Sequence, residues 1–216
     1  KQIGAKFMSS NHSALQIKLA DQIREKLEIS PEIYRAFCEI DRAECVKIVR
    51  DAYTLNPQPI SADQWISSPL TVAKMTQYLE LAGADSVLEI GCGSGYQSAI
   101  LSKIVRRVFA VERIEKLVDE SKIHFKNLGI LNVHVLHADG NFGWEKYAPY
   151  DRILISAAKE SVSEKLFSQL RENGFLIAPI KFQNGQKIVK FQKRRLFIKE
   201  EILDDCEFVP LLNGKF

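Results

Sequence analysis

The sequence lacks several features that would point to particular classes of protein. No apolar run approaches the ~20 residues that a membrane-spanning helix needs, and the N-terminus has no apolar stretch of the kind found in signal peptides. The four cysteines form no CxxC pair, and the four histidines form no i, i+4 pair. The net charge of +3 is too small to demand a nucleic-acid partner. We therefore expect a cytoplasmic protein with reduced thiols and with no bound metal, nucleic acid or membrane.

The length and composition are those of one globular domain. The chain has 216 residues, of which 46% are hydrophobic and 26% are charged, so it can bury a large core. Residues 10–50 are expected to be mainly helical, because leucine and isoleucine recur every four positions from Leu15 to Leu27. A serine followed by proline predicts helix starts at Pro31 and Pro69. The prolines within residues 56–59 predict a loop between these helices.

From residue 86 the pattern changes to short apolar strands separated by helical stretches. The predicted strands are Ser86 to Ile90, Arg107 to Glu112, Val133 to His137, Asp151 to Ser156 and Phe175 to Ile180. This alternation predicts βαβ crossovers and a parallel sheet. Two more strand-like segments, Lys187 to Phe191 and Glu207 to Leu212, have no helical pattern between them. The fold class is therefore α/β: a Rossmann-like, doubly wound, mostly parallel sheet with an antiparallel C-terminal edge and N-terminal helices.

A glycine-rich loop follows the first of these strands. In VLEIGCGSGYQSAILS, residues 87–102, the spacing is GxGxG, and Glu89 stands two residues before the first glycine. A dinucleotide site would need a small residue at position 96, where this chain has Tyr96. The pattern instead resembles the first motif of S-adenosylmethionine-dependent methyltransferases, in which the carboxylate suits the positively charged amino group of the cofactor. The loop residues that this resemblance assigns to the cofactor, with S-adenosylhomocysteine as the product, are Glu89, Gly91, Cys92, Gly93, Gly95 and Gln97.

Two later strand ends carry acidic residues in matching positions. Glu112 ends the second strand, where a carboxylate can accept hydrogen bonds from both ribose hydroxyls, and Arg113 follows it. Asp139, next to Gly140, follows the third strand, where such a fold places the residue that reads the adenine amino group. The alternatives are a solvated charge paired with Arg113 in the first case and an ordinary Asp-Gly turn in the second.

Longer segments resemble the protein-L-isoaspartate O-methyltransferase family over roughly residues 20–212. The segments that carry the resemblance are VLEIGCGSGYQSA, ERI, ADGNFGW, APYDRILISAA, QLRENGFLIAPI and the terminal FVPL. The resemblance implies methyl transfer from S-adenosylmethionine to the carboxylate of isoaspartyl residues in damaged proteins and peptides, with repair through a succinimide. It places Ser67 at the family's active-site serine, Ile66 beside the substrate, and Val209 on a last strand that pairs with the substrate backbone.

The resemblance is imperfect around this serine. Trp65 replaces a family threonine, and the segment that begins at Arg42 matches an arginine-x-x-phenylalanine-valine-proline pattern only loosely. Taken without the family, Ser67 is equally well explained as a helix cap before Pro69. Capping and substrate contact are compatible, because a capping loop can also line a cleft.

Three other functions compete with this one. Basic residues between Lys187 and Lys199 could contact the phosphates of an RNA substrate, although a solvated surface explains them as well. A nicotinamide oxidoreductase is disfavoured by Tyr96. A binding module that has lost turnover would share the fold, because fold alone does not fix function.

The expected organisation is a single methyltransferase domain over residues 1–216. It comprises an N-terminal helical and substrate-loop region (10–82), a cofactor-binding core (83–180) and C-terminal strands (181–216). We expect the protein to act as a monomer.

Overall fold

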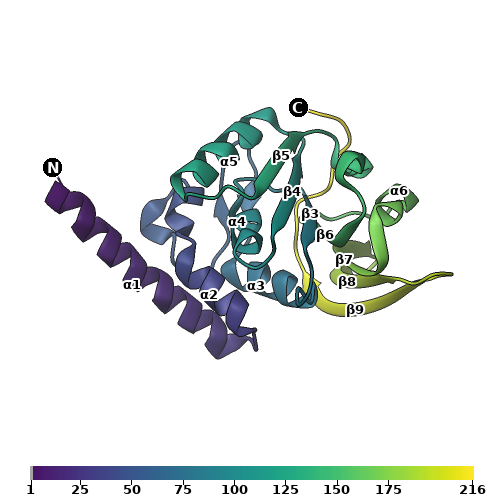
Figure 1. Ribbon diagram of the computed structural model, residues 1–216, viewed down its shortest axis with the longest axis horizontal. Helices are drawn as coiled ribbons and strands as arrows, with labels where there is room; N and C mark the ends of the chain where they lie inside the picture. Colours follow the sequence, from purple (N-terminus) through teal and green to yellow (C-terminus); the bar gives the residue numbers. More distant parts are fainter. Residues whose placement is uncertain (1) are drawn as a thin grey trace.

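The chain folds into a central sheet flanked by helices (Figure 1). This computed structural model describes residues 2–216, with side chains described from residue 12 onward. The α-helices are α1 (Gln2–Lys26), α2 (Pro31–Glu39), α3 (Pro69–Tyr78), α4 (Tyr96–Ser102), α5 (Glu115–Asn127) and α6 (Glu164–Ser168). Short 3-10 helices are η1 (Arg42–Cys45), η2 (Val49–Asp51), η3 (Gly140–Phe142) and η4 (Glu145–Tyr147). None of the helices described has the length and hydrophobicity that crossing a bilayer demands.

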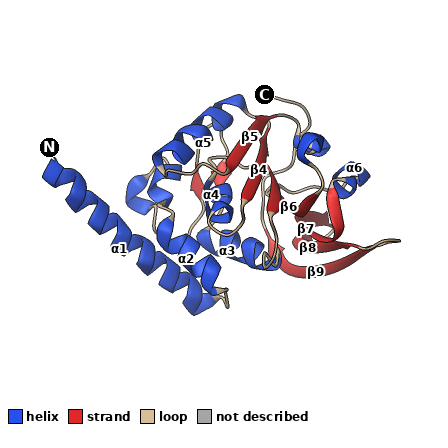
Figure 2. Cartoon of the chain, in the orientation of Figure 1, coloured by secondary structure: helices blue, strands red, loops and turns tan. Residues whose placement is uncertain are grey.

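The strands form one large sheet and one small hairpin. They are β1 (Gln58–Pro59), β2 (Trp65–Ile66), β3 (Ser86–Ile90), β4 (Arg107–Glu112), β5 (Val133–His137), β6 (Tyr150–Ile155), β7 (Leu170–Phe182), β8 (Gly185–Lys193) and β9 (Ile198–Cys206). The large sheet has the order β5-β4-β3-β6-β7-β8-β9 (Figure 1), and Figure 2 shows its strands in red between helices in blue. The first five strands in this order, from β5 through β4, β3 and β6 to β7, pair in parallel. Strands β8 and β9 are added antiparallel. The predicted fold class, including its antiparallel edge, is therefore confirmed.

The central strands are buried on both faces, which is why they read as continuous apolar runs. In β3, Leu88 and Ile90 belong to the apolar core that includes Leu166 of α6. Val87 points to the opposite face, in the core that includes Met75 of α3. Helices thus cover both faces of the sheet, as a doubly wound fold requires.

The N-terminal helices begin where the serine-proline signals place them. Ser30 caps α2 by accepting a hydrogen bond from the Ile33 backbone N–H at 3.4 Å, and Pro31 is the first helical residue. In α1, Leu19 and Ile23 are buried as the four-residue spacing predicts, but Leu15 is 41% exposed. The buried face of α1 therefore begins at Gln16, which is 7% exposed, and not at Leu15.

Two predicted features of the connecting segments are wrong. The proline-containing segment is not a plain loop, because β1 and β2 pair as an antiparallel hairpin. The segment from Glu207 to Leu212 contains no extended strand, and the last strand is β9. Strand β9 lies at the sheet edge and is rich in charge, so it lacks the apolar signal that marks a buried strand.

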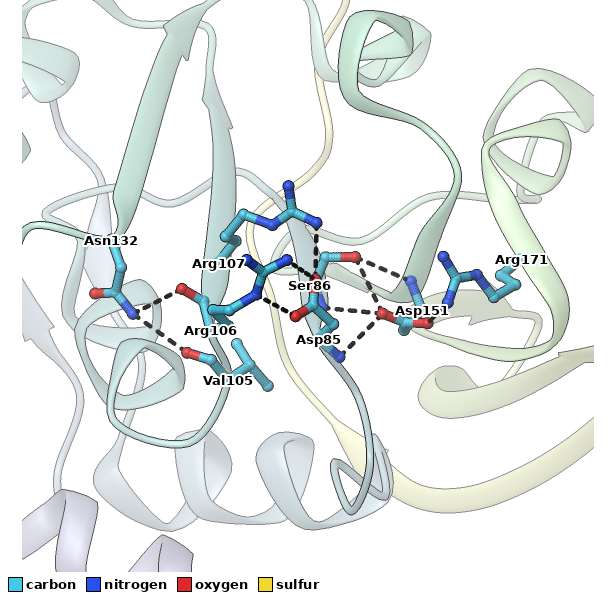
Figure 3. Close-up of polar contacts among 8 residues, drawn as sticks. All are labelled: Asp85, Ser86, Val105, Arg106, Arg107, Asn132, Asp151 and Arg171. Carbon is cyan, nitrogen blue, oxygen red and sulfur yellow. Dashed lines mark hydrogen bonds and ion pairs between the residues drawn. The ribbon is translucent and has the colours of Figure 1, made fainter.

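A polar network joins the N-terminal ends of the central strands β3, β4 and β6 (Figure 3). The buried Asp151 carboxylate accepts hydrogen bonds from the backbone N–H groups of Asp85 and Ser86, both at 3.0 Å. Its other oxygen accepts from Arg171 at 2.7 Å. Asp85 in turn pairs with Arg106. These contacts fix the register of the strands at their N-terminal ends, and the candidate site lies at the opposite ends.

Candidate cofactor and substrate site

The candidate site lies at the carboxyl ends of β3, β4 and β6. From β3 the chain crosses to β4 on one side, and from β6 it crosses to β7 on the other side. The strand order therefore reverses between β3 and β6, and in open α/β sheets ligands bind in the crevice outside such a switch point. Hollows at this place are lined by the glycine loop, by Ser156 after β6, and by the β1–β2 hairpin.

The glycine loop turns tightly because its glycines adopt left-handed conformations. Gly91 and Gly93 have φ values of +81° and +54°, and both line the hollows. Gly95, at φ +89°, is the N-cap of α4, and a Cβ there would lie 2.6 Å from the Phe125 ring. Gly95 does not line the hollows, so its observed role is to let α4 approach α5. Cys92 and Gln97 both line the hollow on the α3 side.

Glu112 is held in place by the glycine loop. Its carboxylate accepts hydrogen bonds from the Gly93 N–H at 2.9 Å and from the Ile114 N–H at 3.0 Å. The residue is 5% exposed, so it is not a solvated charge, and among the described residues it forms no ion pair with Arg113. A carboxylate oxygen has two acceptor sites, so each Glu112 oxygen can still accept a hydroxyl group.

Glu89 is a buried carboxylate without a cationic partner among the described residues. It accepts hydrogen bonds from the Ser98 and Ser156 hydroxyls, the latter at 3.0 Å. Burial raises the pKa of Glu89 to about 7; the two hydroxyls act to lower it, and the nearby Glu112 raises it further. Such a group is stabilised in its charged form by a ligand that brings a positive charge, and the ammonium group of S-adenosylmethionine fits this need.

The rim at the ends of β4 and β5 is held by the C-terminal segment. The Asp139 carboxylate accepts from the Gly214 N–H at 2.7 Å, while Arg113 donates to the Gly214 carbonyl at 3.0 Å. The Phe216 N–H donates to the Arg113 carbonyl at 2.7 Å. In Figure 1 this segment, in yellow, runs from β9 past the strand ends to the chain terminus near β5. Gly140 and Arg113 line the hollow beside this rim, whereas Asp139 is engaged with the C-terminal segment.

The Asp139 carboxylate is more acidic than an ordinary aspartate. Burial opposes ionisation, but hydrogen bonds from the backbone of Gly214 and Asn141 outweigh it and lower the pKa of Asp139. The Asp-Gly turn is thus part of a charged, ordered rim. Its Oδ2 atom, with one donor bound, can accept a second.

The structure separates the two serines before α3. Ser68 is the N-cap, and its hydroxyl accepts from the Thr71 N–H at 3.1 Å. The alternative explanation of Ser67 as the helix cap is therefore wrong. Among the described residues the Ser67 hydroxyl has no hydrogen-bond partner, and Ser67 lines both a hollow at the glycine loop and an outer cleft.

The outer cleft is large enough for a short stretch of peptide. It has a volume of about 580 Å³, and its lining residues are Pro57, Trp65, Ser67, Ser68, Thr71, Ser156, Glu207, Phe208 and Val209. Val209 is not on a strand, so that part of the prediction is wrong; its carbonyl accepts from the Ala158 N–H at 2.8 Å. Ile66 is buried and lines the hollow at the glycine loop.

Several residues at the site are not evident in the sequence. Ser98 and Ser156 lie 9 and 67 positions from Glu89, and neither belongs to a recognisable spacing. The C-terminal rim contacts depend on residues about 75 to 100 positions apart. A strand-end position was the one available signal for Ser156. Among the described residues, no three His, Cys, Asp or Glu side chains gather closely enough to hold a metal ion.

The fold and the site together define the class: this is an S-adenosylmethionine-dependent methyltransferase built on a Rossmann-like domain. Within that class, the model of the Protein-L-isoaspartate(D-aspartate) O-methyltransferase family matches residues 13–215. The chain therefore belongs to the protein-L-isoaspartate O-methyltransferase family.

Curated relatives and solved structures agree with this assignment. A protein-L-isoaspartate O-methyltransferase of Helicobacter pylori strain G27 is 51% identical over 199 residues, which are 91% of this chain and 95% of the relative. One of Aliivibrio fischeri strain ES114 is 39% identical over 92% of this chain and 96% of its own length. A solved protein-L-isoaspartate O-methyltransferase has a TM-score of 0.82 at 28% identity, over 89% of this chain and 64% of that one. A Plasmodium falciparum structure solved with S-adenosyl-L-homocysteine has a TM-score of 0.80 at 24% identity, over 93% and 98% of the two chains, and supports the fold.

Proposed function

We propose that this chain transfers the methyl group of S-adenosylmethionine to the free carboxylate of L-isoaspartyl residues in damaged proteins and peptides. The neighbouring backbone amide nitrogen then displaces methanol from the methyl ester to form a succinimide, and hydrolysis of this ring returns part of the damaged residue to aspartate. The observation that carries the proposal, beside family membership, is the place of Ser67. Ser67, whose hydroxyl has no hydrogen-bond partner among the described residues, lines both the hollow at the glycine loop and the outer cleft.

The reaction requires the protein to position the carboxylate and the methyl donor, and it requires no proton transfer. A carboxylate has a reference pKa of about 4 and is already ionised at neutral pH, so it needs no general base. S-adenosylmethionine, when bound, supplies an electrophilic methyl group on a sulfonium. Holding the two reactants in line can contribute on the order of 7–11 kcal/mol. This is consistent with a site that has hydroxyls and backbone groups around the cleft.

The roles of the cofactor residues follow from their charges and places. Glu89 pairs with the ammonium group, and Glu112 accepts the ribose hydroxyls while the Gly93 and Ile114 N–H groups hold it. Asp139, with Gly140, reads the adenine amino group. The cofactor lies against the loop formed by Gly91, Cys92 and Gly93, and against Gln97 in the first turn of α4. This loop is supported by Gly95, the N-cap of α4, and by Arg113 at the C-terminal rim.

The substrate residues belong to the outer cleft. Ser67 donates its hydroxyl to the isoaspartyl carboxylate and holds it beside the methyl group. The Val209 carbonyl is already bonded to Ala158, so the N–H of Val209 is the group left for the peptide backbone. Ile66 packs beneath this arrangement. We retain the division into regions 10–82, 83–180 and 181–216, and a monomeric cytoplasmic enzyme, as parts of the proposal.

A specific observation disfavours an RNA substrate. The basic residues of β8 are engaged within the protein: Lys187 pairs with Asp205 at 2.6 Å, and Lys190 pairs with Glu80. Lys193 donates to the carbonyl groups of Phe167 and Leu170, both at 2.7 Å. These three lysines are therefore engaged within the protein, and in this basic stretch only Arg194, Arg195 and Lys199 are left exposed for contact with a phosphate.

Methyl transfer to a matched pair of peptides tests the proposal. One peptide carries isoaspartate and the other aspartate at the same position, with labelled S-adenosylmethionine as donor. We expect base-labile label on the isoaspartyl peptide alone, and its loss in Asp139→Ala. Equal labelling of both peptides, or labelling of neither while S-adenosylhomocysteine still binds, would refute the proposed substrate and leave the class of enzyme intact.

A further inference from the structure

Arg42 is the most deeply buried cation of the described chain. It lies in η1, is 0% exposed, and is among the largest fully buried side chains. Its Nη2 donates to the Ser67 carbonyl at 3.0 Å and to the Asn56 carbonyl at 3.4 Å. The guanidinium lies over the Tyr96 ring, with its carbon 4.8 Å from the ring centroid. One side chain thus touches the segment before β1, the residue after β2, and the first residue of α4.

This cation has no ion pair among the described residues. The Nε and Nη1 atoms of Arg42 are buried without a hydrogen-bond partner, as is the Tyr96 hydroxyl. The neighbouring Asp41 carboxylate forms no ion pair with Arg42 and is instead directed to the Tyr53 hydroxyl at 2.6 Å and to the Ala43 N–H at 2.9 Å. Burial lowers the pKa of Arg42, but a guanidinium remains protonated in proteins.

A buried, unpaired charge is costly, so stability alone does not explain it. A methionine or leucine would fill the same space without the desolvation penalty. What arginine adds here is a planar guanidinium whose Nη2 donates to two carbonyl groups from opposite ends of one segment while its face lies over the Tyr96 ring. That segment contains the β1–β2 hairpin and ends at Ser67, the serine whose hydroxyl has no hydrogen-bond partner among the described residues.

We propose that Arg42 is a positioning residue for methyl transfer: its buried guanidinium holds the Asn56 and Ser67 carbonyl groups against Tyr96 and so fixes the Ser67 hydroxyl relative to the glycine loop. This rests on the proposed function of Ser67. Tyr96 also lines the hollow at the glycine loop, so the contact couples the hairpin to the helix that starts beside the cofactor site. The unpaired positive charge behind the hairpin additionally favours an anionic substrate over a neutral one.

The first test compares Arg42→Met with Arg35→Met. Arg35 is exposed and pairs with Glu32 on α2, away from the site, so it controls for the loss of an arginine. A displaced Ser67 weakens the hold on the peptide carboxylate, so Arg42→Met should raise KM for the isoaspartyl peptide by roughly 10- to 100-fold, with a smaller fall in kcat. The Kd for S-adenosylhomocysteine should stay within about twofold of wild type. An unchanged KM, or a Kd that rises in step with KM, would overturn the proposal.

The second test needs no turnover and uses the milder Arg42→Lys. Lysine keeps the charge but lacks the planar guanidinium that lies over Tyr96 while donating to both carbonyl groups, so amide hydrogen exchange in residues 58–67 should be faster than in wild type while the sheet strands are unchanged. KM for the isoaspartyl peptide should lie between those of wild type and Arg42→Met. Unaltered exchange in 58–67 would overturn the proposal. Because exchange is read without substrate, a wild-type enzyme that fails to methylate isoaspartyl peptide would refute the proposed function separately.

Discussion

The adjacent serines before α3 have different hydrogen-bond partners, and single substitutions can therefore separate them. The Ser68 hydroxyl caps α3, whereas the Ser67 hydroxyl is unpaired among the described residues. Loss of a cap typically costs about 1 kcal/mol, and loss of an unpaired surface hydroxyl costs little.

Ser67→Ala should therefore lower kcat/KM for the isoaspartyl peptide by roughly 10-fold or more while the free energy of unfolding stays within about 0.5 kcal/mol of wild type. Ser68→Ala, the matched variant, should lower the free energy of unfolding by about 1 kcal/mol. Peptide kinetics and urea unfolding measure the two effects. A stability loss confined to Ser67→Ala would show that the caps have been assigned the wrong way round.

We expect Glu89 to make cofactor affinity depend on pH. Its pKa is raised to about 7 by burial, so near and below neutral pH the carboxyl group carries a proton in the free protein. Pairing with the ligand ammonium group favours the ionised form, so binding must release that proton. Below the raised pKa, affinity should therefore increase as pH rises, by at most about tenfold per unit, and it should level off above it.

We expect the Kd for S-adenosylhomocysteine to fall between pH 6 and pH 8, with proton release seen by calorimetry in buffers of different ionisation enthalpy. Glu89→Gln removes the titrating group and should bind more weakly with a flatter profile. The same pH profile in Glu89→Gln as in wild type would assign the proton to another group.

At the scale of secondary-structure elements, the C-terminal segment acts as a brace across the ends of β4 and β5. Its backbone bonds to Asp139 and Arg113, and the Phe216 carbonyl accepts from the Glu115 N–H at 2.8 Å at the start of α5. This segment therefore orders two residues that flank the Glu112 side of the site.

Deletion of residues 213–216 should raise the Kd for S-adenosylhomocysteine by roughly 3- to 10-fold, because Asp139 and Arg113 lose the contacts that order them. Isothermal titration of the shortened and full chains measures this. Lys215→Ala is the control, since Lys215 is exposed and its side chain forms no hydrogen bond or ion pair within the described part of the chain. An unaltered Kd on deletion would mean that the rim is ordered without the brace.

At the scale of the whole molecule, a stabilising polar network and the candidate site lie at opposite ends of the same strands. The Asp151 network ties the starting ends of β3, β4 and β6 together, while the candidate site lies at their carboxyl ends (Figure 3). A substitution at the starting ends of these strands should therefore lower the free energy of unfolding without weakening cofactor binding.

Asp151→Ala leaves the buried Ser86 N–H and the partly buried Asp85 N–H without an acceptor, and should lower the free energy of unfolding by about 2–4 kcal/mol. Asp151→Asn keeps one carbonyl acceptor and should lose less. Denaturant unfolding gives both values. At temperatures where Asp151→Ala remains folded, its Kd for S-adenosylhomocysteine should match wild type; a selective loss of binding would contradict this separation.

The sequence alone determined the parallel strands, the glycine loop and the acidic strand ends, because each depends on short-range patterns of burial and backbone freedom. The bounds of β3, β4 and β5 match the predicted segments. What the sequence could not show depends on contacts between distant positions. The pairing of β1 with β2, the choice of Ser68 as the cap, the charged edge strand β9, the brace that joins Gly214 to Asp139, and the buried Arg42 are all decided by tertiary structure. In each case the partner is a backbone group or a side chain that no local spacing identifies, so only the folded chain brings the two together.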